Sequence, residues 1–176
     1  MRRFAPLIRH GGRVLDLAAG SGRHTRLVLD MGCEVVAVDR DVSGLRALAG
    51  PRCKVRDMDL ESGEPWRLGG GYDAIVVANY LHRPLLPDIA AALAPGGVLI
   101  YETFALGNER LGRPRTPEFL LRPGELLASF ATLTVIAFEQ GKVDAPRPAV
   151  IQRIAATNGP LGRLPAPVLE QTRPPV

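Results

Sequence analysis

Val14-Leu15-Asp16-Leu17-Ala18-Ala19-Gly20-Ser21-Gly22-Arg23-His24-Thr25 is the stretch that decides the fold of this chain. An apolar run comes first, a turn of small residues follows it, and the last residues resemble the start of a helix. That order is typical of a strand–turn–helix unit, in which free backbone N–H groups at the helix start face a ligand. Small residues in the turn allow the backbone to approach that ligand closely.

Asp16 indicates which kind of ligand this turn accepts. A phosphate-binding turn reads G-x-G-x-x-G, but here Ala18 occupies the first glycine position and Thr25 the third. A carboxylate two residues before the turn repels a pyrophosphate and attracts an ammonium group. We therefore expect a nucleoside with an amino-acid tail and no phosphate, which describes S-adenosylmethionine (SAM). An ordinary tight turn between a strand and a helix is the structural alternative.

Apolar and amphipathic segments alternate along the rest of the chain. The pattern predicts strands over 13–18, 34–39, 54–58, 73–78, 98–104, 133–138 and 149–155. It predicts helices over 2–9, 22–31 (capped by Ser21), 41–48 (capped by Asp41 or Ser43), 84–93 and 122–130. This alternation favours an α/β fold, with a Rossmann-like, doubly wound and mostly parallel sheet. The last two strands are expected to pair as a hairpin.

Four polar side chains fall at or just past the ends of predicted strands. They are Asp16, Asp39, Asp59 and Asn79. Ligands of doubly wound sheets bind at the carboxyl ends of the strands. We therefore expect these four side chains to converge on one crevice.

The composition fits one domain of 176 residues. No apolar run approaches the ~20 residues of a membrane-spanning helix, and residues 1–10 are basic without an apolar core, so neither a membrane span nor a secretory signal is expected. Cys33 and Cys53 lack C-x-x-C spacing and are expected to be reduced thiols of a cytoplasmic protein. The three histidines are scattered, so their spacing predicts no metal site.

The charge is basic, with 22 Lys and Arg against 18 Asp and Glu, and only Lys54 and Lys142 are lysines. An anionic partner such as RNA is one explanation. A compositional bias toward arginine is the other, and the lack of a dense basic run favours it. We assign residues 1–157 to the folded domain and residues 158–176, which are rich in proline, to an irregular tail.

Three motifs carry a resemblance to a known family. Asp16–Gly22 resembles the first motif, [DE]-x-G-x-G-x-G, of the class I SAM-dependent methyltransferases, with Ala18 at the first glycine. Asp39 matches their acidic residue after the second strand, and residues 94–99 are similar to their L-x-P-G-G-x-L turn. The resemblance covers residues 10–157 and implies seven strands, of which the last is antiparallel.

Within that family, residues 79–84 (Asn-Tyr-Leu-His-Arg-Pro) and 101–104 (Tyr-Glu-Thr-Phe) resemble the small bacterial branch described as tellurite-resistance-like. Many relatives place a lid helix before the first strand. Here the preceding segment is short, so we expect an open pocket or further residues upstream.

The resemblance also implies a set of cofactor-binding residues: Asp16, Ala18, Gly20, Gly22, Asp39, Arg40, Asp59, Leu60, Asn79 and Tyr80. In this assignment Asp16 faces the ammonium group, and Asp39 accepts hydrogen bonds from the ribose hydroxyls. Asp59 accepts from the adenine amine, with Asp57 as the rival for that role. Asn79 and Tyr80 border the methyl group and the substrate.

Candidates for catalysis and for substrate binding follow the same strands. His82 is a candidate general base or a structural residue, and Tyr80 is a candidate catalytic group or a core aromatic. A long loop carries Arg110, Arg113 and Arg115, which suit an anionic substrate or a nucleic-acid phosphate. The alternative is a solvated loop whose arginines pair with Glu109 and Glu118.

The sequence thus predicts a cytoplasmic SAM-dependent methyltransferase that acts on a small molecule. An RNA methyltransferase and a catalytically silent SAM-binding protein are the alternatives. A nicotinamide dehydrogenase is a weaker one, because Asp16 and the absent third glycine disfavour a dinucleotide. No membrane partner is expected, and the sequence does not determine the acceptor or the oligomeric state.

Overall fold

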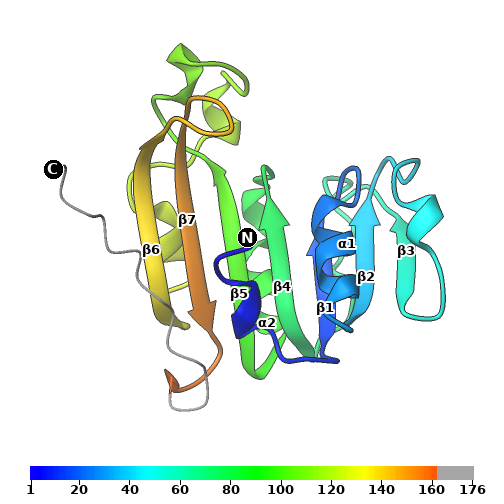
Figure 1. Ribbon diagram of the computed structural model, residues 1–176. Coiled ribbons are helices and arrows are strands. Elements are labelled where there is room, and N and C mark those ends of the chain that lie inside the picture. Colours follow the sequence, from blue (N-terminus) through cyan, green and yellow to red (C-terminus); the bar gives the residue numbers. More distant parts are fainter. Residues whose placement is uncertain (162–176) are drawn as a thin grey trace, which may run out of the picture.

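The computed structural model describes residues 1–161, and it forms one seven-stranded sheet in the order β3-β2-β1-β4-β5-β7-β6 (Figure 1). The strands are β1 (Arg13–Leu17), β2 (Glu34–Asp39), β3 (Cys53–Asp57), β4 (Tyr72–Ala78), β5 (Leu93–Phe104), β6 (Thr134–Val143) and β7 (Ala149–Thr157). The pairings β2–β3, β1–β2, β1–β4 and β4–β5 are parallel, whereas β7 runs antiparallel to both of its neighbours, β5 and β6. The predicted α/β sheet with an antiparallel last strand is therefore confirmed.

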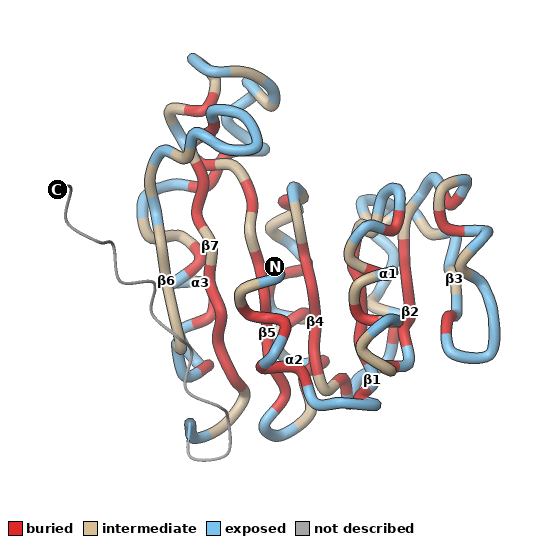
Figure 2. Tube along the Cα trace, in the orientation of Figure 1, coloured by how far each residue is buried: buried red, intermediate tan, exposed pale blue. Residues whose placement is uncertain are grey.

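The central strands are continuous apolar runs because both of their faces are covered. In β1, Leu15 lies opposite Val36 of β2 and Ile75 of β4, and none of the β1 residues after Arg13 is exposed. Figure 2 shows the buried residues concentrated along these strands. Burial on both faces explains why these segments lack the alternation of polar and apolar residues seen in half-exposed strands.

Helices lie on both faces of the sheet. The N-terminal segment, with the 3₁₀ turn η1 (Ala5–Leu7), and α1 (Arg23–Asp30) pack on one face. The other face is covered by α2 (Leu86–Ala91), which follows η3 (Arg83–Leu85), and by α3 (Glu125–Ser129). Of the helix predicted over 2–9 only η1 forms, but its predicted apolar residues are buried: Phe4, Leu7 and Ile8.

The helix predicted over 22–31 is confirmed as α1, but its predicted cap and the helix predicted over 41–48 were wrong. α1 begins after Gly22, whose φ is 77°, and no side chain caps its start, so Ser21 is not the cap. The helix predicted over 41–48 is reduced to the 3₁₀ turn η2 (Arg46–Leu48). The Asp41 carboxylate accepts the N–H of Ser43 at 3.0 Å, as a helix cap does, but only a turn follows, in which the Val42 carbonyl accepts the N–H groups of Leu45 and Arg46.

The Pro95-Gly96-Gly97 segment lies inside β5 rather than before it, and a register shift between Tyr72 and Ala74 of β4 accommodates it. A Cβ on Gly97 would lie 2.6 Å from the carbonyl oxygen of Tyr72, so the strands can pair here only with glycine. The predicted hairpin of β6 and β7 is confirmed and is longer than expected. Of the predicted tail, residues 162–176 lie outside the described residues.

None of the helices in the described part of the chain is both long and apolar enough to cross a membrane. The carboxyl ends of the parallel strands share one edge of the sheet with the loop between β5 and α3 and with the β6–β7 connection (Figure 1). That edge is where the candidate site lies.

Candidate functional site

The turn after β1 has three residues with positive φ: Ala18 at 55°, Gly20 at 56° and Gly22 at 77°. A Cβ on Gly22 would lie 2.7 Å from Leu48 Cδ1, which would have to shift, and the φ of 77° itself favours glycine at this position. A Cβ on Gly20 would meet no protein atom within 4 Å, so this part of the turn faces open space. Ala18 takes the conformation of the glycine it replaces, at a cost of about 1 kcal/mol.

Asp39, the last residue of β2, joins this turn to the neighbouring strand. Its Oδ2 accepts the N–H of Gly20 at 2.7 Å, and its Oδ1 accepts the N–H of Asp41 at 3.0 Å. Each carboxylate oxygen has two lone pairs, so both oxygens keep capacity for a ligand. Asp39 therefore shapes the turn and also presents acceptors to the adjoining cavity.

A cavity of about 250 Å³, here called the Asp39 cavity, lies beside this carboxylate. It brings together most of the predicted cofactor residues: Ala18, Asp39, Arg40, Asp59, Leu60, Asn79 and Tyr80. Met58 and Glu61 complete the lining. Asp57 pairs in register with Asp39 on β3 but does not line the cavity, so the structure places Asp59 there rather than its rival.

A second cavity, of about 390 Å³, extends along the turn and is called the turn cavity. Its lining includes Gly20, Ser21, Arg23 and His24. It shares Ala18 and Asn79 with the Asp39 cavity, so the two are neighbouring parts of one hollow at the strand ends. Asn79 has a φ of 57°, a conformation that asparagine tolerates better than most residues.

Asp16 lies beneath the turn rather than on the cavity surface. Its side chain is buried, with 1% of the residue exposed, and Oδ2 accepts the hydroxyl of Thr25 at 2.6 Å. Burial raises the pKa of Asp16 to about 6, although the hydrogen bonds from Thr25 act in the opposite direction. Threonine at the third glycine position thus has a specific partner, which the sequence alone did not reveal.

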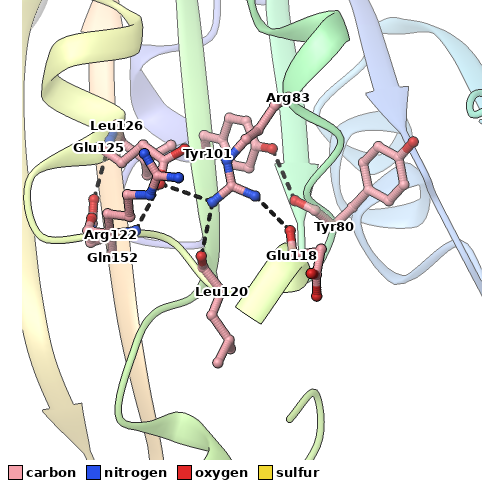
Figure 3. Close-up of polar contacts among 9 residues, drawn as sticks. All are labelled: Tyr80, Arg83, Tyr101, Glu118, Leu120, Arg122, Glu125, Leu126 and Gln152. Carbon is pink, nitrogen blue, oxygen red and sulfur yellow. Dashed lines mark hydrogen bonds and ion pairs between the residues drawn. The ribbon is translucent and has the colours of Figure 1, made fainter. Parts of the chain in front are cut away.

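Tyr80 lines the Asp39 cavity, and its phenol oxygen, Oη, is buried and has no hydrogen-bond partner among residues 1–161. Burial and the nearby charges of Glu61 and Asp59 raise the pKa of Tyr80, so the phenol stays protonated and can donate a hydrogen bond. Its backbone carbonyl accepts the hydroxyl of Tyr101 at 2.9 Å, which fixes the segment after β4 (Figure 3).

The two histidines near the site differ in their placement. His82 precedes η3 in an extended conformation and lines none of the cavities described for residues 1–161. His24 lines the turn cavity instead, and burial together with the charge of Arg23 lowers its pKa to about 4. Sequence reasoning missed His24, although its position two residues after Gly22 was the available signal.

A third cavity, of about 900 Å³, lies between the β5–α3 loop and the β6–β7 connection and is called the arginine pocket. Arg113 and Arg115 line it, as does Asn79 at its border with the other cavities. Arg110 is exposed on η4 (Asn108–Arg110) and does not line it, so the structure separates this residue from the other two. Arg147 of the β6–β7 connection lines it as well, and sequence reasoning missed this residue because it is distant along the chain.

The alternative of a loop tethered by ion pairs is not observed in the described residues. The Glu109 carboxylate accepts the N–H of Gly107, and the ion pairs found within residues 1–161 involve neither Glu109 nor Glu118. Arg113 and Arg115 are likewise absent from those ion pairs. The guanidinium groups are therefore free to meet a ligand.

Arg83 fixes the loop that forms this pocket (Figure 3). It donates from Nε and Nη2 to the two carboxylate oxygens of Glu125, at 2.6 and 3.0 Å. It also donates to the backbone carbonyls of Glu118 at 2.6 Å and Leu120 at 2.9 Å. One side chain after β4 thereby holds the end of the β5–α3 loop against the start of α3.

Comparisons with known proteins agree with this arrangement. A family described as "Methyltransferase domain" matches residues 1–115. An uncharacterized methyltransferase of Mycobacterium bovis is 33% identical over 129 residues, which are 69% of this chain and 51% of that protein. A demethylmenaquinone methyltransferase of Paenarthrobacter aurescens is 30% identical over 123 residues, which are 65% of this chain and 47% of that protein. The chain thus spans about half the length of the curated relatives it matches.

A solved structure of an S-adenosylmethionine dependent methyltransferase from Mesorhizobium loti has the same fold, with a TM-score of 0.68 and 18% sequence identity. The match covers 89% of this chain and 94% of that chain. The comparisons do not confirm the tellurite-resistance-like branch, which stays a prediction.

Proposed function

The chain belongs to the methyltransferase-domain family, and on that premise we propose that it transfers the methyl group of SAM to a small-molecule acceptor. One observation carries the proposal. Asp39, Asp59 and Asn79 converge from three strand ends on the Asp39 cavity, beside the open face of the turn. This is where a doubly wound sheet binds a nucleoside.

The residues of the Asp39 cavity fit the adenosine part of SAM. Asp39 has lone pairs left for the two ribose hydroxyls, and a carboxylate is suited to accept from a diol. Asp59 accepts the N–H of Glu61 through Oδ1 at 2.9 Å, which leaves acceptor capacity for the adenine amine. Leu60 supplies an apolar surface for the base, and the unpaired phenol of Tyr80 supplies a donor.

The turn cavity fits the amino-acid part. The open space at Gly20 admits a ligand against the backbone, and Arg23 offers a positive charge to a carboxylate. Asp16 is buried, so its influence on the ammonium group acts through an intervening water. Gly22 contributes indirectly, since its lack of a side chain lets the helix start close against Leu48.

SAM, when bound, would supply a methyl carbon to which the acceptor's lone pair forms a bond, while the electrons of the broken carbon–sulfur bond remain on sulfur. The chain's contribution is to position the acceptor and exclude water. Asn79 borders all three cavities and is the residue best placed to lie between cofactor and acceptor. Tyr80 can donate a hydrogen bond there, whereas His82 is outside the cavities and receives no proton-transfer role.

We assign the domain to residues 1–157, and we propose a cytoplasmic location and a small molecule rather than RNA as acceptor.

The experiment has two stages. Calorimetric titration with S-adenosylhomocysteine (SAH) is expected to give one site per chain, and absence of binding contradicts the proposal. Labelled SAM is then incubated with fractionated cell extract. Label in the small-molecule fraction is expected, label in RNA supports the alternative acceptor, and binding without transfer supports a silent protein.

A further inference from the structure

The arginine pocket combines positive charge with apolar surface. Arg113 and Arg115 come from the β5–α3 loop and Arg147 from the β6–β7 connection, and no Asp or Glu lines the pocket. Three cations placed together without a counter-ion repel each other, and an anion in the pocket offsets that repulsion. Arginine in particular forms paired hydrogen bonds with carboxylates and phosphates.

The apolar part of the lining indicates the rest of the ligand. Phe119 is 45% exposed and Leu111 is 43% exposed, and both line the pocket, so they place apolar surface beside the guanidinium groups. Phe104 also lines the pocket, near its border with Asn79. These side chains suit an aromatic or apolar body attached to the anionic group, and a volume of about 900 Å³ accommodates one small molecule.

Asn108 holds the two arginine-bearing segments in place. It is 1% exposed, its Nδ2 donates to the carbonyl of Pro114 at 3.3 Å, and its Oδ1 accepts the N–H of Val150 at 3.2 Å. The buried amide of Asn108 therefore links the loop between Arg113 and Arg115 to Val150 at the start of β7, close in sequence to Arg147. Together with the Arg83 contacts to Glu118 and Leu120, it forms the walls before a ligand arrives.

Resting on the function proposed above, we infer that the arginine pocket binds the anionic group of an aromatic or apolar acceptor. The group is a carboxylate or a phosphate. Asn79 borders both this pocket and the cofactor cavities, so an acceptor anchored by the arginines extends toward the proposed methyl position. The three cations are exposed but gathered around one pocket, which differs from the extended basic stripe that follows a nucleic-acid backbone.

The test uses phenyl phosphate and benzoate as anionic probes, and benzamide as the neutral counterpart of benzoate. Each is titrated by calorimetry and NMR into the full-length protein saturated with SAH, and into the protein alone. Saturable binding of both anions is expected, with benzamide at least tenfold weaker than benzoate. Absence of saturable binding of either anion overturns the inference.

The variants separate the pocket from general surface charge. Arg113→Gln/Arg115→Gln/Arg147→Gln is expected to weaken phenyl phosphate binding at least tenfold, and Arg147→Gln alone at least threefold. Arg110→Gln removes one charge from the same loop outside the pocket and is expected to change binding less than twofold. Equal binding by the triple variant and the wild type overturns the inference.

Two further measurements distinguish the possible failures. SAH affinity is expected to be the same in all variants. If the wild type does not bind SAH, the proposed function is contradicted, but the anion titrations of the protein alone still test the pocket. A ten-nucleotide single-stranded RNA is the competing ligand. Tighter binding of RNA than of phenyl phosphate, lost in the triple variant, overturns the small-molecule assignment.

Discussion

The backbone N–H of Gly20 donates to Asp39 Oδ2 over 2.7 Å, so the turn after β1 and the end of β2 form one unit. Asp39, the acidic residue that ends β2, therefore has a structural role in addition to the proposed ligand role. It supports the conformation of the turn and also offers acceptors to the proposed ribose. Removing its carboxylate therefore affects both the ligand and the loop that faces it.

Asp39→Ala is expected to weaken SAH binding by more than ~1 kcal/mol, about fivefold or more, because it removes charge-assisted hydrogen bonds and the support of Gly20. Calorimetric titration measures the change. Asp57→Ala is the matched control, since Asp57 lies in register with Asp39 but outside the cavity. Unchanged affinity in a folded Asp39→Ala protein contradicts the ribose role, as does an equal loss in the control.

Ala18→Gly is expected to have a free energy of unfolding about 1 kcal/mol higher than that of Ala19→Gly, because glycine adopts a φ of 55° without the steric cost that alanine carries, while both variants add similar unfolded-state entropy. Ala19→Gly is the control, since Ala19 has no positive φ and its replacement by glycine only adds unfolded-state entropy. Urea denaturation followed by circular dichroism compares the two. Equal free energies of unfolding for the two variants refute the strain assigned to Ala18.

Asp16→Asn is expected to change the pH dependence of stability. The pKa of Asp16 is raised from 3.8 to about 6 in the folded protein, so the folded state holds this proton more tightly than the unfolded chain does. The contribution is fully present below pH 4 and is lost as pH rises through 6, by about 3 kcal/mol. Asp39 and Arg23 are the charged groups that modify it.

The readout is the difference in unfolding free energy between Asp16→Asn and the wild type at pH 4.5, 5.5 and 7. His24 titrates in the opposite sense, because its lowered pKa costs stability as pH falls, and taking the difference removes that contribution. The advantage of the asparagine variant is expected to grow with pH. A difference independent of pH shows that Asp16 titrates normally.

Arg83→Gln is expected to lower the free energy of unfolding by about 1–3 kcal/mol, because Glu125 loses a two-point partner and two backbone carbonyls lose their donor. Hydrogen exchange of residues 117–121 is expected to accelerate at least tenfold. Arg67→Gln is the control, since the Arg67–Glu64 pair is exposed and contributes little. Similar effects of both variants contradict the anchoring role of Arg83.

The sheet was predictable because its strands are long apolar runs separated by glycine and proline. The reversal of the last strand followed from resemblance, and the convergence of Asp39, Asp59 and Asn79 followed from the parallel topology. Helices were less predictable. Residues 41–48 have a helical pattern and an Asp41 cap, but only the 3₁₀ turn η2 forms.

The rest of the site depends on contacts between residues that are distant along the chain. Arg147 joins Arg113 only because β7 returns to the same edge of the sheet, and Asn108 contacts Val150 for the same reason. Asp16 was assigned from its charge, but its burial depends on Thr25 and on packing around it. No local sequence pattern indicates these long-range contacts.

Because β7 is reversed, the proposed nucleoside site and the proposed acceptor site are formed by different loops. The groups assigned to the proposed nucleoside follow the first four strands, whereas the hairpin tip near Arg147 belongs to the other half of the sheet. Insertions or exchanges at that tip can retune which compounds are accepted without disturbing the donor half. The fold therefore permits acceptor preference to diverge among descendants while methyl-donor recognition is inherited intact.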